Sequence, residues 1–242
     1  CPRDHFAVIG ETFYAYQPTG FYGSFLQKIS KENLSFGNKA IEVSTAIIAR
    51  VGKDIFWDVP KDSKQEDIDF FKTKWNAEGF RVHVSRRGYH SDGCFCVVKP
   101  GCIVTLRDVQ DYATEFPGWD ILYLPDQSWS KVSPFLKVKE KVRGRWWIPG
   151  EEENDKLTHF VNTWLTDWVG YVEETVFDVN MLSIDQHTII CNNYNKEVFE
   201  HFKKHKVEPI VCNFRHRYFW DGGIHCVTQD LYREGKMEDY FG

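Results

Sequence analysis

Residues 221–228, with the sequence DGGIHCVT, form the sharpest local feature of the chain. Two glycines let the backbone approach another group closely, and a His-Cys pair follows them after one residue. A thiol just beyond such a turn is a candidate nucleophile. It acts only as the thiolate, so it needs a polarising neighbour, because the pKa of a free cysteine is about 8.5. The alternative is a small buried side chain after a turn, and the stretch alone leaves both open.

A second polar turn, residues 89–94 with the sequence YHSDGC, leads into an apolar stretch that is typical of a strand. Residues i and i+2 of an extended chain face the same side, so His90 and Asp92 can point into one pocket. There a histidine would serve as general acid and base, and a carboxylate would bind a cation. The alternative is a solvated turn at the start of a strand.

A zinc site has to be weighed next, because Cys94 and Cys96 share one face of the predicted strand and His90 lies upstream. Cys-x-Cys departs from the usual ligand spacing of zinc sites, and no second ligand pair with clean spacing follows. The other histidines, His201 and His205 among them, show no spacing that predicts a site. We therefore expect core thiols and no metal. The sequence also lacks a dinucleotide-binding fingerprint, a P-loop and a serine nucleophile elbow, and no organic cofactor is predicted.

The composition bounds the class of protein. The chain has 242 residues, 42% hydrophobic and 27% charged, which excludes intrinsic disorder. The net charge is −5, and the sequence has no block of basic residues. We therefore do not expect the chain to bind nucleic acid or an anionic membrane surface. No apolar run approaches the ~20 residues of a membrane span. Seven cysteines without a small-scaffold pattern favour a reduced, cytoplasmic protein.

Short strands and single helices alternate along the chain, which indicates an α/β or α+β fold built from small units. We expect a single domain over residues 1–242, and the sequence shows no internal repeat. Strands are predicted at residues 5–13 (with a turn), 41–51, 54–57, 81–84, 94–98, 102–106, 121–124, 184–191 (a hairpin) and 207–214. Helices are predicted at residues 62–76, 109–114 and 196–206. The irregular residues 125–155 are expected to be an insertion or lid.

Taken together, these segments resemble the arginine:glycine amidinotransferase family of the guanidine-modifying pentein superfamily. The resemblance covers nearly the whole chain in the same order, at low identity. Its most specific part is a C-terminal block formed by residues 179–214 and 221–226. The other matching stretches are residues 2–4, 50–56, 90–92 with the turn at 100–101, 230–235 and 239–241.

The resemblance implies an α/β, pentein-type propeller of five ββαβ units around a central active-site pocket. It makes Cys226 the nucleophile, His90 the general acid and base, and Asp92 and Asp4 the carboxylates that grip the guanidinium of the donor. The chemistry suits these residue types. Carboxylates hold a planar cation, the thiolate attacks its central carbon, and the histidine protonates the departing amine. No cofactor or metal is needed.

The sequence departs from the family pattern at the acidic residue that orients the catalytic histidine. In an ungapped alignment the carboxylate that orients the catalytic histidine falls on Ser44, and the second acidic position falls on Ile47. Glu42 lies two residues before Ser44 and would substitute if the strand bulges there. Loss of the orienting acid would leave the tautomer of His90 less controlled.

The contacts to the donor's carboxylate also differ from the family pattern. The family's serines before the C-terminal block align with Glu173 and Glu174, and its carboxylate-binding arginine aligns with Val109, with Arg107 close by. Two carboxylates would repel a carboxylate, so we expect a guanidino compound that lacks this group or carries an extra amine. The alternative is a slipped alignment in which both glutamates are solvated.

Three functions stay open at this point. The first is an amidinotransferase that moves an amidino group from arginine or a related guanidino donor to an amine through a Cys thiouronium intermediate. The second is a deiminase or hydrolase on the same scaffold, with water as acceptor. The third is a catalytically weakened guanidinium-binding protein. The expected partners are small molecules, and a homodimer is open. Since the family carries a further segment before residues 2–4, we expect part of the first unit to precede Cys1.

Overall fold

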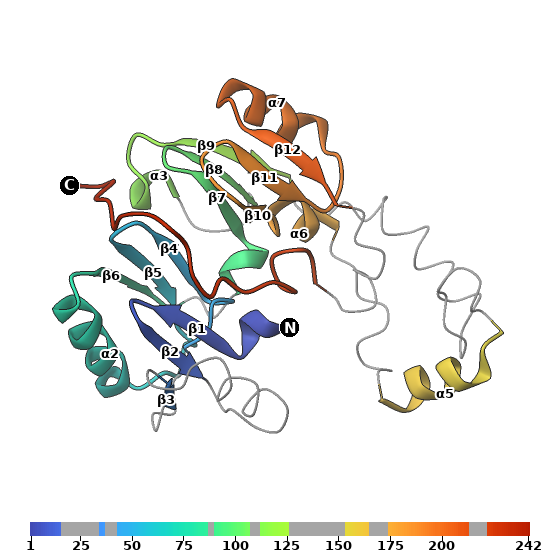
Figure 1. The fold of residues 1–242 in the computed structure, drawn as a ribbon, viewed down its shortest axis with the longest axis horizontal. Coiled ribbons are helices and arrows are strands. Elements are labelled where there is room, and N and C mark those ends of the chain that lie inside the picture. The colour runs from blue at the N-terminus through green and yellow to red at the C-terminus, as the bar shows by residue number, and fades with distance from the viewer. Residues whose placement is uncertain are drawn as a thin grey trace.

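The computed structural model describes residues 1–15, 34–36, 43–86, 90–106, 112–125, 153–164, 174–212 and 222–242. Within these ranges the strands form four separate sheets of three strands each (Figure 1). In every sheet the first two strands pair antiparallel, and the third pairs parallel to the middle strand. One small structural unit is therefore repeated four times, although the sequence shows no repeat.

The parallel pairs explain the order of the elements, because a parallel connection needs a crossover, usually a helix. The second unit runs β4 (Ile48–Val51), β5 (Asp54–Asp58), α2 (Gln65–Ala77) and β6 (Arg81–Ser85). The third runs β7 (Phe95–Lys99), β8 (Cys102–Leu106), α3 (Tyr112–Glu115) and β9 (Asp120–Leu124). The fourth runs β10 (Leu182–Ser183), β11 (Thr188–Cys191), α7 (Lys196–Lys204) and β12 (Glu208–Val211).

The first unit holds β1 (Phe6–Ile9), β2 (Thr12–Ala15) and β3 (Leu34–Phe36), and residues 16–33 lie outside the described ranges. The fold is thus α/β, with four units among the described residues where the resemblance implies five. The other helices are η1 (Pro2–Asp4), η2 (Ser91–Gly93), α5 (Asp155–Trp164) and α6 (Glu174–Val179). None of the helices in the described ranges is long and apolar enough to cross a membrane.

Helix α2 shows how the sequence builds one of these units. Ile68, Phe71 and Trp75 recur at intervals of three and four, and all three are buried. The Trp75 ring packs edge-on against Trp57 and Tyr14, with ring centroids 4.9 and 5.7 Å apart. The helix predicted at residues 62–76 is confirmed, and its apolar face joins the first and second units in one core.

The strand predicted at residues 41–51 is confirmed at its end and wrong at residues 43–47. Only Ile48–Val51 is a strand, residues 43–47 form a loop, and residues 41 and 42 lie outside the described ranges. In the loop the backbone N–H of Thr45 donates to the Phe6 carbonyl at 3.3 Å, and that of Ala46 donates to the Arg3 carbonyl at 3.1 Å. These residues are apolar because the loop packs inside the molecule. A buried loop and a buried strand both show a continuous apolar run, so the sequence pattern does not distinguish them.

Three other predicted segments lie partly outside the described residues. Most of the expected insertion or lid, residues 126–152, falls there, and so do residues 109–111 of the predicted helix at 109–114 and residues 213 and 214 of the last predicted strand. The remaining predicted strands and helices appear in the described ranges with ends shifted by a few residues.

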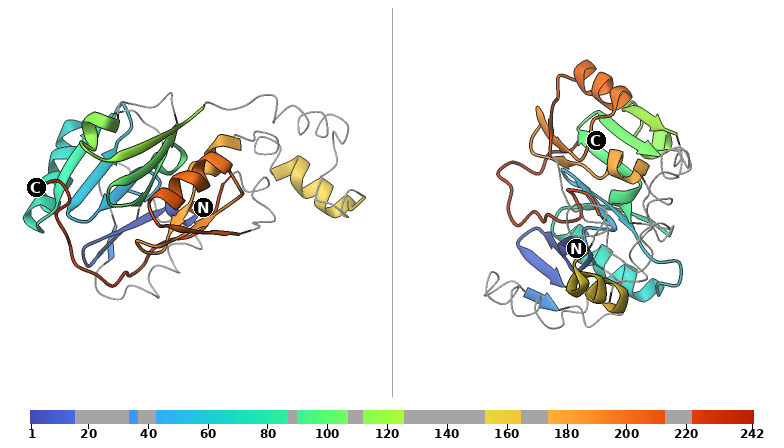
Figure 2. Two further views of the ribbon diagram at one scale, coloured as in Figure 1. Left: turned by 90° about the horizontal axis from the view of Figure 1, so that it is seen from above. Right: turned by 90° about the vertical axis from the view of Figure 1, so that its right-hand side faces the viewer.

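Residues 231–242, here called the C-terminal strap, contain neither helix nor strand. The strap runs across the molecule to the turn between β4 and β5 (Figures 1 and 2). There the backbone N–H of Lys53 donates to the Glu238 carbonyl at 2.8 Å, and Arg81 pairs with Asp239 at 2.7 Å. The Phe241 ring stacks on Trp119 with centroids 5.0 Å apart. The strap therefore ties the second unit to the third.

Gly52 is expected to be indispensable at this anchor. It has a φ of +58°, and a Cβ built on it would lie 2.2 Å from the Glu238 carbonyl oxygen. Gly101 shares the left-handed conformation, with a φ of +84°, but a Cβ there meets nothing within 4 Å. Gly101→Ala should therefore cost only the backbone strain, about 1–2 kcal/mol. Gly52→Ala should cost a further ~1–3 kcal/mol for the steric overlap.

The free energy of unfolding in urea measures both variants against the unmodified chain. If Gly52→Ala and Gly101→Ala lower the free energy of unfolding equally, the strap does not pack against the β4–β5 turn as described.

Candidate active site

Cys226 lies in a turn that two other segments hold in place. Its Sγ is 2.9 Å from the Asn180 Nδ2, which donates to it, and 3.4 Å from the Asp92 Oδ2. Asn180 follows α6 directly, and Asp92 belongs to η2 at the entrance to β7. Residues that directly precede the third and the fourth unit thus meet at a single sulfur atom, although Asp92 and Cys226 are 134 positions apart.

The amide of Asn180 organises this turn. Its Oδ1 accepts hydrogen bonds from the backbone N–H groups of His225 at 3.0 Å and Cys226 at 3.2 Å. Its Nδ2 also donates to the backbone carbonyl of Asp92 at 3.0 Å. Because Asn180 is buried, replacing its amide would leave several polar groups unsatisfied at once.

Asn192 holds both Asn180 and the Cys226 turn in place through hydrogen bonds to their backbones. Its Nδ2 donates to the Asn180 carbonyl at 2.6 Å, and its Oδ1 accepts from the Ile224 backbone N–H at 2.7 Å. A Cβ on Gly223 would lie 2.5 Å from the Asn180 Oδ1 and 2.8 Å from the Asn192 Nδ2. The second glycine of the motif is therefore needed for close approach to two buried amides.

Asp92 is a buried carboxylate with one oxygen unused. Its Oδ2 accepts from the His225 Nδ1 at 2.9 Å, whereas its Oδ1 has no hydrogen-bond partner among the residues that the structure describes. Burial alone would raise the pKa of Asp92, but the hydrogen bond from His225 and the charge of nearby His90 outweigh it and lower the pKa. The site thus holds a negative charge with an oxygen free to accept hydrogen bonds.

His225 contributes to the site in a way that the sequence did not predict. Its ring faces Asp92, and burial lowers its pKa, so the ring is neutral at pH 7. Nδ1 carries the proton, because the Asp92 carboxylate only accepts. His225 therefore orients Asp92. The Cys226 sulfur accepts a hydrogen bond from the Asn180 Nδ2, and its thiol donates one to the Asp92 Oδ2.

The same surroundings keep Cys226 protonated. Burial raises the pKa of the thiol, the Asp92 carboxylate raises it further, and the hydrogen bond from Asn180 only partly offsets them. The sulfur is positioned but not ionised at neutral pH.

His90 lies beside Asp4 at the edge of this site. Its Nδ1 is 3.8 Å from the Asp4 Oδ1, and its side chain is 56% exposed. His90 does not contact the Cys226 sulfur directly, but it lies near enough for its charge to act on Asp92. Cys226 and Asp92 are thus in direct contact, and His90 and Asp4 form a second pair next to them.

The positions on which the family's acids fall can now be compared with the structure. Ser44 and Ile47 are both buried and bring no carboxylate to His90. Among the described residues, Asp4 places a carboxylate oxygen 3.8 Å from the His90 Nδ1. Glu42 lies outside the described residues, as do the other residues expected near the donor's carboxylate, which are Arg107, Val109, Glu173 and the side chain of Glu174.

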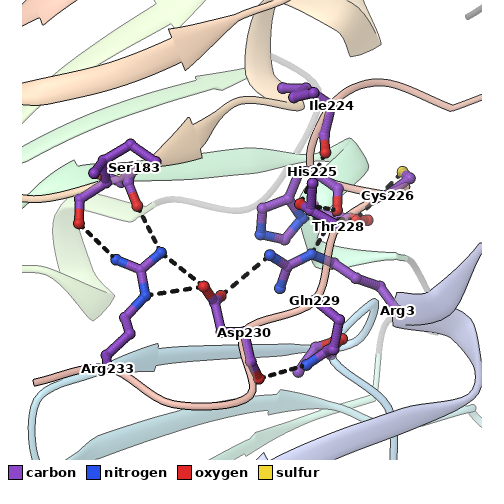
Figure 3. Close-up of polar contacts among 12 residues, drawn as sticks. Arg3, Ser183, Ile224, His225, Cys226, Thr228, Gln229, Asp230 and Arg233 are labelled. Atoms are coloured by element: carbon purple, nitrogen blue, oxygen red, sulfur yellow. Dashed lines mark hydrogen bonds and ion pairs between the residues drawn. The ribbon is translucent and has the colours of Figure 1, made fainter.

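Arg3 and Asp230 fasten the Cys226 turn to the rest of the molecule (Figure 3). The buried Arg3 guanidinium donates to the His225 carbonyl at 2.5 Å and to the Asp230 carboxylate at 3.2 Å. Arg233 binds the same carboxylate from the other side at 3.0 Å and reaches the Ser183 carbonyl at 2.6 Å. No sequence pattern predicts this network, because its members are scattered along the chain.

A hollow of about 530 Å³ lies elsewhere, between the second and third units. Phe56, Arg81, His83 and Phe241 are among the residues that line it, and none of the predicted catalytic residues does. The predicted nucleophile and its neighbouring carboxylate therefore lie at the Cys226 turn and not at this hollow.

Comparison with known proteins bears on this arrangement. No protein-family model matches the chain. It is 22% identical over 200 residues to the L-arginine:L-lysine amidinotransferase of Pseudomonas savastanoi pv. phaseolicola, covering 81% of this chain and 45% of that protein. It is 23% identical over 197 residues to the mitochondrial glycine amidinotransferase of Xenopus tropicalis, covering 79% and 39%. The chain spans less than half the length of these relatives.

Solved structures share the fold at low identity. SxtG, an amidinotransferase from Microseira wollei in a saxitoxin biosynthetic pathway, superposes with a TM-score of 0.66 at 19% identity, over 99% of this chain and 70% of that one. The inosamine-phosphate amidinotransferase StrB1 from Streptomyces griseus gives 0.64 at 15% identity, with the same coverage. A dimethylarginine dimethylaminohydrolase gives 0.58 at 11% identity, over 93% and 75%. The chain is therefore similar in sequence to amidinotransferases, and it shares its fold with amidinotransferases and with a dimethylarginine dimethylaminohydrolase.

Proposed function

We propose that the chain carries the catalytic centre of an amidinotransferase, with Cys226 as nucleophile, His90 as general acid and base, and Asp92 and Asp4 as carboxylates for the guanidino donor. The observation that carries the proposal is the unpartnered Oδ1 of Asp92. A buried carboxylate oxygen without a partner is costly, and a cationic N–H donor would satisfy it. The Cys226 sulfur lies 3.4 Å from the other oxygen of the same carboxylate, so a guanidinium bound there would have its central carbon near the sulfur.

The reaction would then proceed in two halves. The thiolate attacks the guanidinium carbon and forms a C–S bond. The C–N bond to the leaving amine breaks, and His90 supplies the proton that this amine takes up. The amidino group stays on sulfur as a thiouronium cation. An acceptor amine attacks the same carbon, His90 removes its proton, and the C–S bond breaks to return the thiolate.

The raised pKa of Cys226 fits a nucleophile that the substrate itself activates. Burial and the Asp92 charge hold the thiol protonated in the free protein. A bound guanidinium would offset the charge of Asp92 and add a positive charge beside the sulfur, and both effects lower the pKa of the thiol. The thiolate would therefore form where a donor is already in place, which limits side reactions of the free enzyme.

The Asp4–His90 pair supports the assignment of His90. Asp4 supplies the neighbouring carboxylate that Ser44 and Ile47 cannot supply. Because the His90 side chain is more than half exposed, it can exchange its proton with solvent between the two halves of the reaction. This supports an active enzyme over the binding protein that the loss of the family acid would favour.

Two broader features belong to the same proposal. Three of the four described units have the order strand, strand, helix, strand, which supports the five-unit ββαβ arrangement of the whole protein.

All seven cysteines are free, and the proposed nucleophile requires a free thiol, which supports a reducing compartment such as the cytoplasm. The acceptor is an amine, and the donor is arginine or a related guanidino compound.

Formation of the covalent intermediate is the most direct test of the proposal. Incubation with arginine, or with agmatine as a donor without the carboxylate, should add the mass of one amidino group to the intact protein. Cys226→Ala and Asp92→Asn should both abolish the adduct. Cys212→Ser and Asp185→Asn, matched changes outside the site, should retain it.

The fate of the adduct separates transfer from hydrolysis. Addition of lysine or glycine should discharge it and yield an amidino product of that amine. Discharge at the same rate without an amine would instead indicate a hydrolase. Absence of an adduct with every donor would contradict the catalytic proposal.

The alkylation rate of Cys226 tests the electrostatic part of the account. Asp92→Asn removes the negative charge that raises the thiol's pKa, so the pKa should fall and the thiolate fraction at a given pH should rise. Alkylation by iodoacetamide at a pH below the thiol's pKa should therefore be faster in Asp92→Asn than in the unmodified chain. Peptide mass mapping follows Cys226 separately from the other cysteines. Asp185→Asn should leave the rate unchanged, and an unchanged or slower rate in Asp92→Asn would contradict the assigned cause.

A further inference from the structure

A second cluster of chemistry-bearing side chains lies at the junction of β8, β9 and α7. Cys102 is the first residue of β8, His201 lies in α7, and His205 caps the C-terminal end of that helix. One candidate ligand atom from each of the three lies within 4.8 Å of those of the other two. The cluster shares no residue with the Cys226 site and has no part in the mechanism proposed above.

The fold brings these residues together from positions far apart in the sequence. His201 and His205 are four residues apart, so they lie on one face at the end of α7, where the His205 N–H donates to the His201 carbonyl at 3.2 Å. Cys102 and Asp120 are register partners at the starts of the parallel strands β8 and β9. In Figure 1, α7 lies beside these strands at the outside of the molecule.

The spacing of the donor atoms is close to what a tetrahedral ion requires. Zinc bonds of about 2.0–2.3 Å to nitrogen and sulfur place neighbouring ligand atoms roughly 3.3–3.8 Å apart. The Cys102 Sγ and the His201 Nε2 are already 3.3 Å apart. The third ligand, His205, has to move by little more than an ångström, and its partly exposed side chain leaves room for that.

The surroundings also resemble those of a metal centre. The His205 Nε2 lies 2.8 Å from the Asp120 Oδ2, and metal-bound histidines commonly donate their second N–H to such a carboxylate. The His201 ring hydrogen-bonds the backbone carbonyl of Ile103, which fixes its orientation in the same way. Cys102 and His201 are buried, whereas His205 reaches the surface and provides an entry path.

We infer that Cys102, His201 and His205 form a binding site for a zinc-like divalent ion, with Asp120 as the residue that positions His205. One thiolate and two imidazoles suit zinc and its relatives, whereas magnesium and calcium prefer oxygen ligands. Binding displaces the Cys102 thiol proton to solvent, because the thiolate is the ligand. Solvent fills the fourth position, since Asp120 is already paired with Lys204 and His205. The ion would join the third unit to the fourth.

Cobalt is a suitable probe, because tetrahedral Co²⁺ bound to a thiolate absorbs strongly in the visible and near ultraviolet. The full chain, stripped with a chelator and titrated with Co²⁺, should bind one equivalent with a thiolate-to-cobalt charge-transfer band, and Zn²⁺ should displace it. Cys102→Ser should abolish that band. Asp120→Asn should weaken binding about 10- to 100-fold, as expected for a residue that orients a ligand.

Control variants separate this site from the other thiols. Cys226→Ser and Cys212→Ser should bind Co²⁺ like the unmodified chain. Loss of the band in Cys226→Ser, or its retention in Cys102→Ser, would overturn the inference. If Cys102→Ser does not fold, the partly exposed His205→Gln decides instead, because binding as tight as that of the unmodified chain would also overturn it. Added Zn²⁺ should raise the melting temperature of the unmodified chain and not that of His205→Gln.

Discussion

The hydrogen bonds of the buried Asn180 amide are the interaction on which the candidate site depends. One side chain accepts from two consecutive backbone N–H groups of the Cys226 turn and donates to the Asp92 carbonyl and the Cys226 sulfur. The positions of thiol and carboxylate are therefore not independent. Any change that moves Asn180 would displace both, and with them the geometry that a guanidinium would need.

The rest of the molecule serves to hold this amide and its partners in place. Asn192 fixes the backbone of Asn180, Arg3 fixes the carbonyl of His225, and Asp230 is clamped between Arg3 and Arg233. These contacts join the beginning and end of the described chain to the third and fourth units. Such a site requires the complete arrangement of sheets, which explains why its residues are spread over the whole sequence.

The sequence predicted the residues that carry a recognisable local signal. Helix α2 is marked by its periodic apolar face, and Cys226 is marked by the glycines that let the turn approach Asn180 and Asn192. The proximity of Cys226 to Asp92 followed from the resemblance to the amidinotransferases, since 134 positions separate the two residues and no local pattern relates them. The loop at residues 43–47 was mistaken for a strand, because burial in a loop and burial in a sheet select the same apolar residues.

What the sequence could not provide was the set of long-range polar contacts. Asn180 is an ordinary asparagine until the fold places two backbone N–H groups against it. His201 and His205 have a spacing that means little until Cys102, on another element, lies beside them. The place of Asp4 beside His90 also depends on the fold. The alignment directs attention to Ser44, Ile47 and Glu42, whereas among the described residues a carboxylate reaches His90 from η1.

The proposed mechanism requires that Asp92 binds a guanidinium directly beside the Cys226 sulfur. A crystal structure of the Cys226→Ala variant soaked with the guanidino donor would show whether it does. We expect a guanidinium hydrogen-bonded to the Asp92 Oδ1, with its central carbon facing residue 226 and a substituted nitrogen toward His90. A donor bound at another place, with the Asp92 Oδ1 still unpartnered, would contradict it.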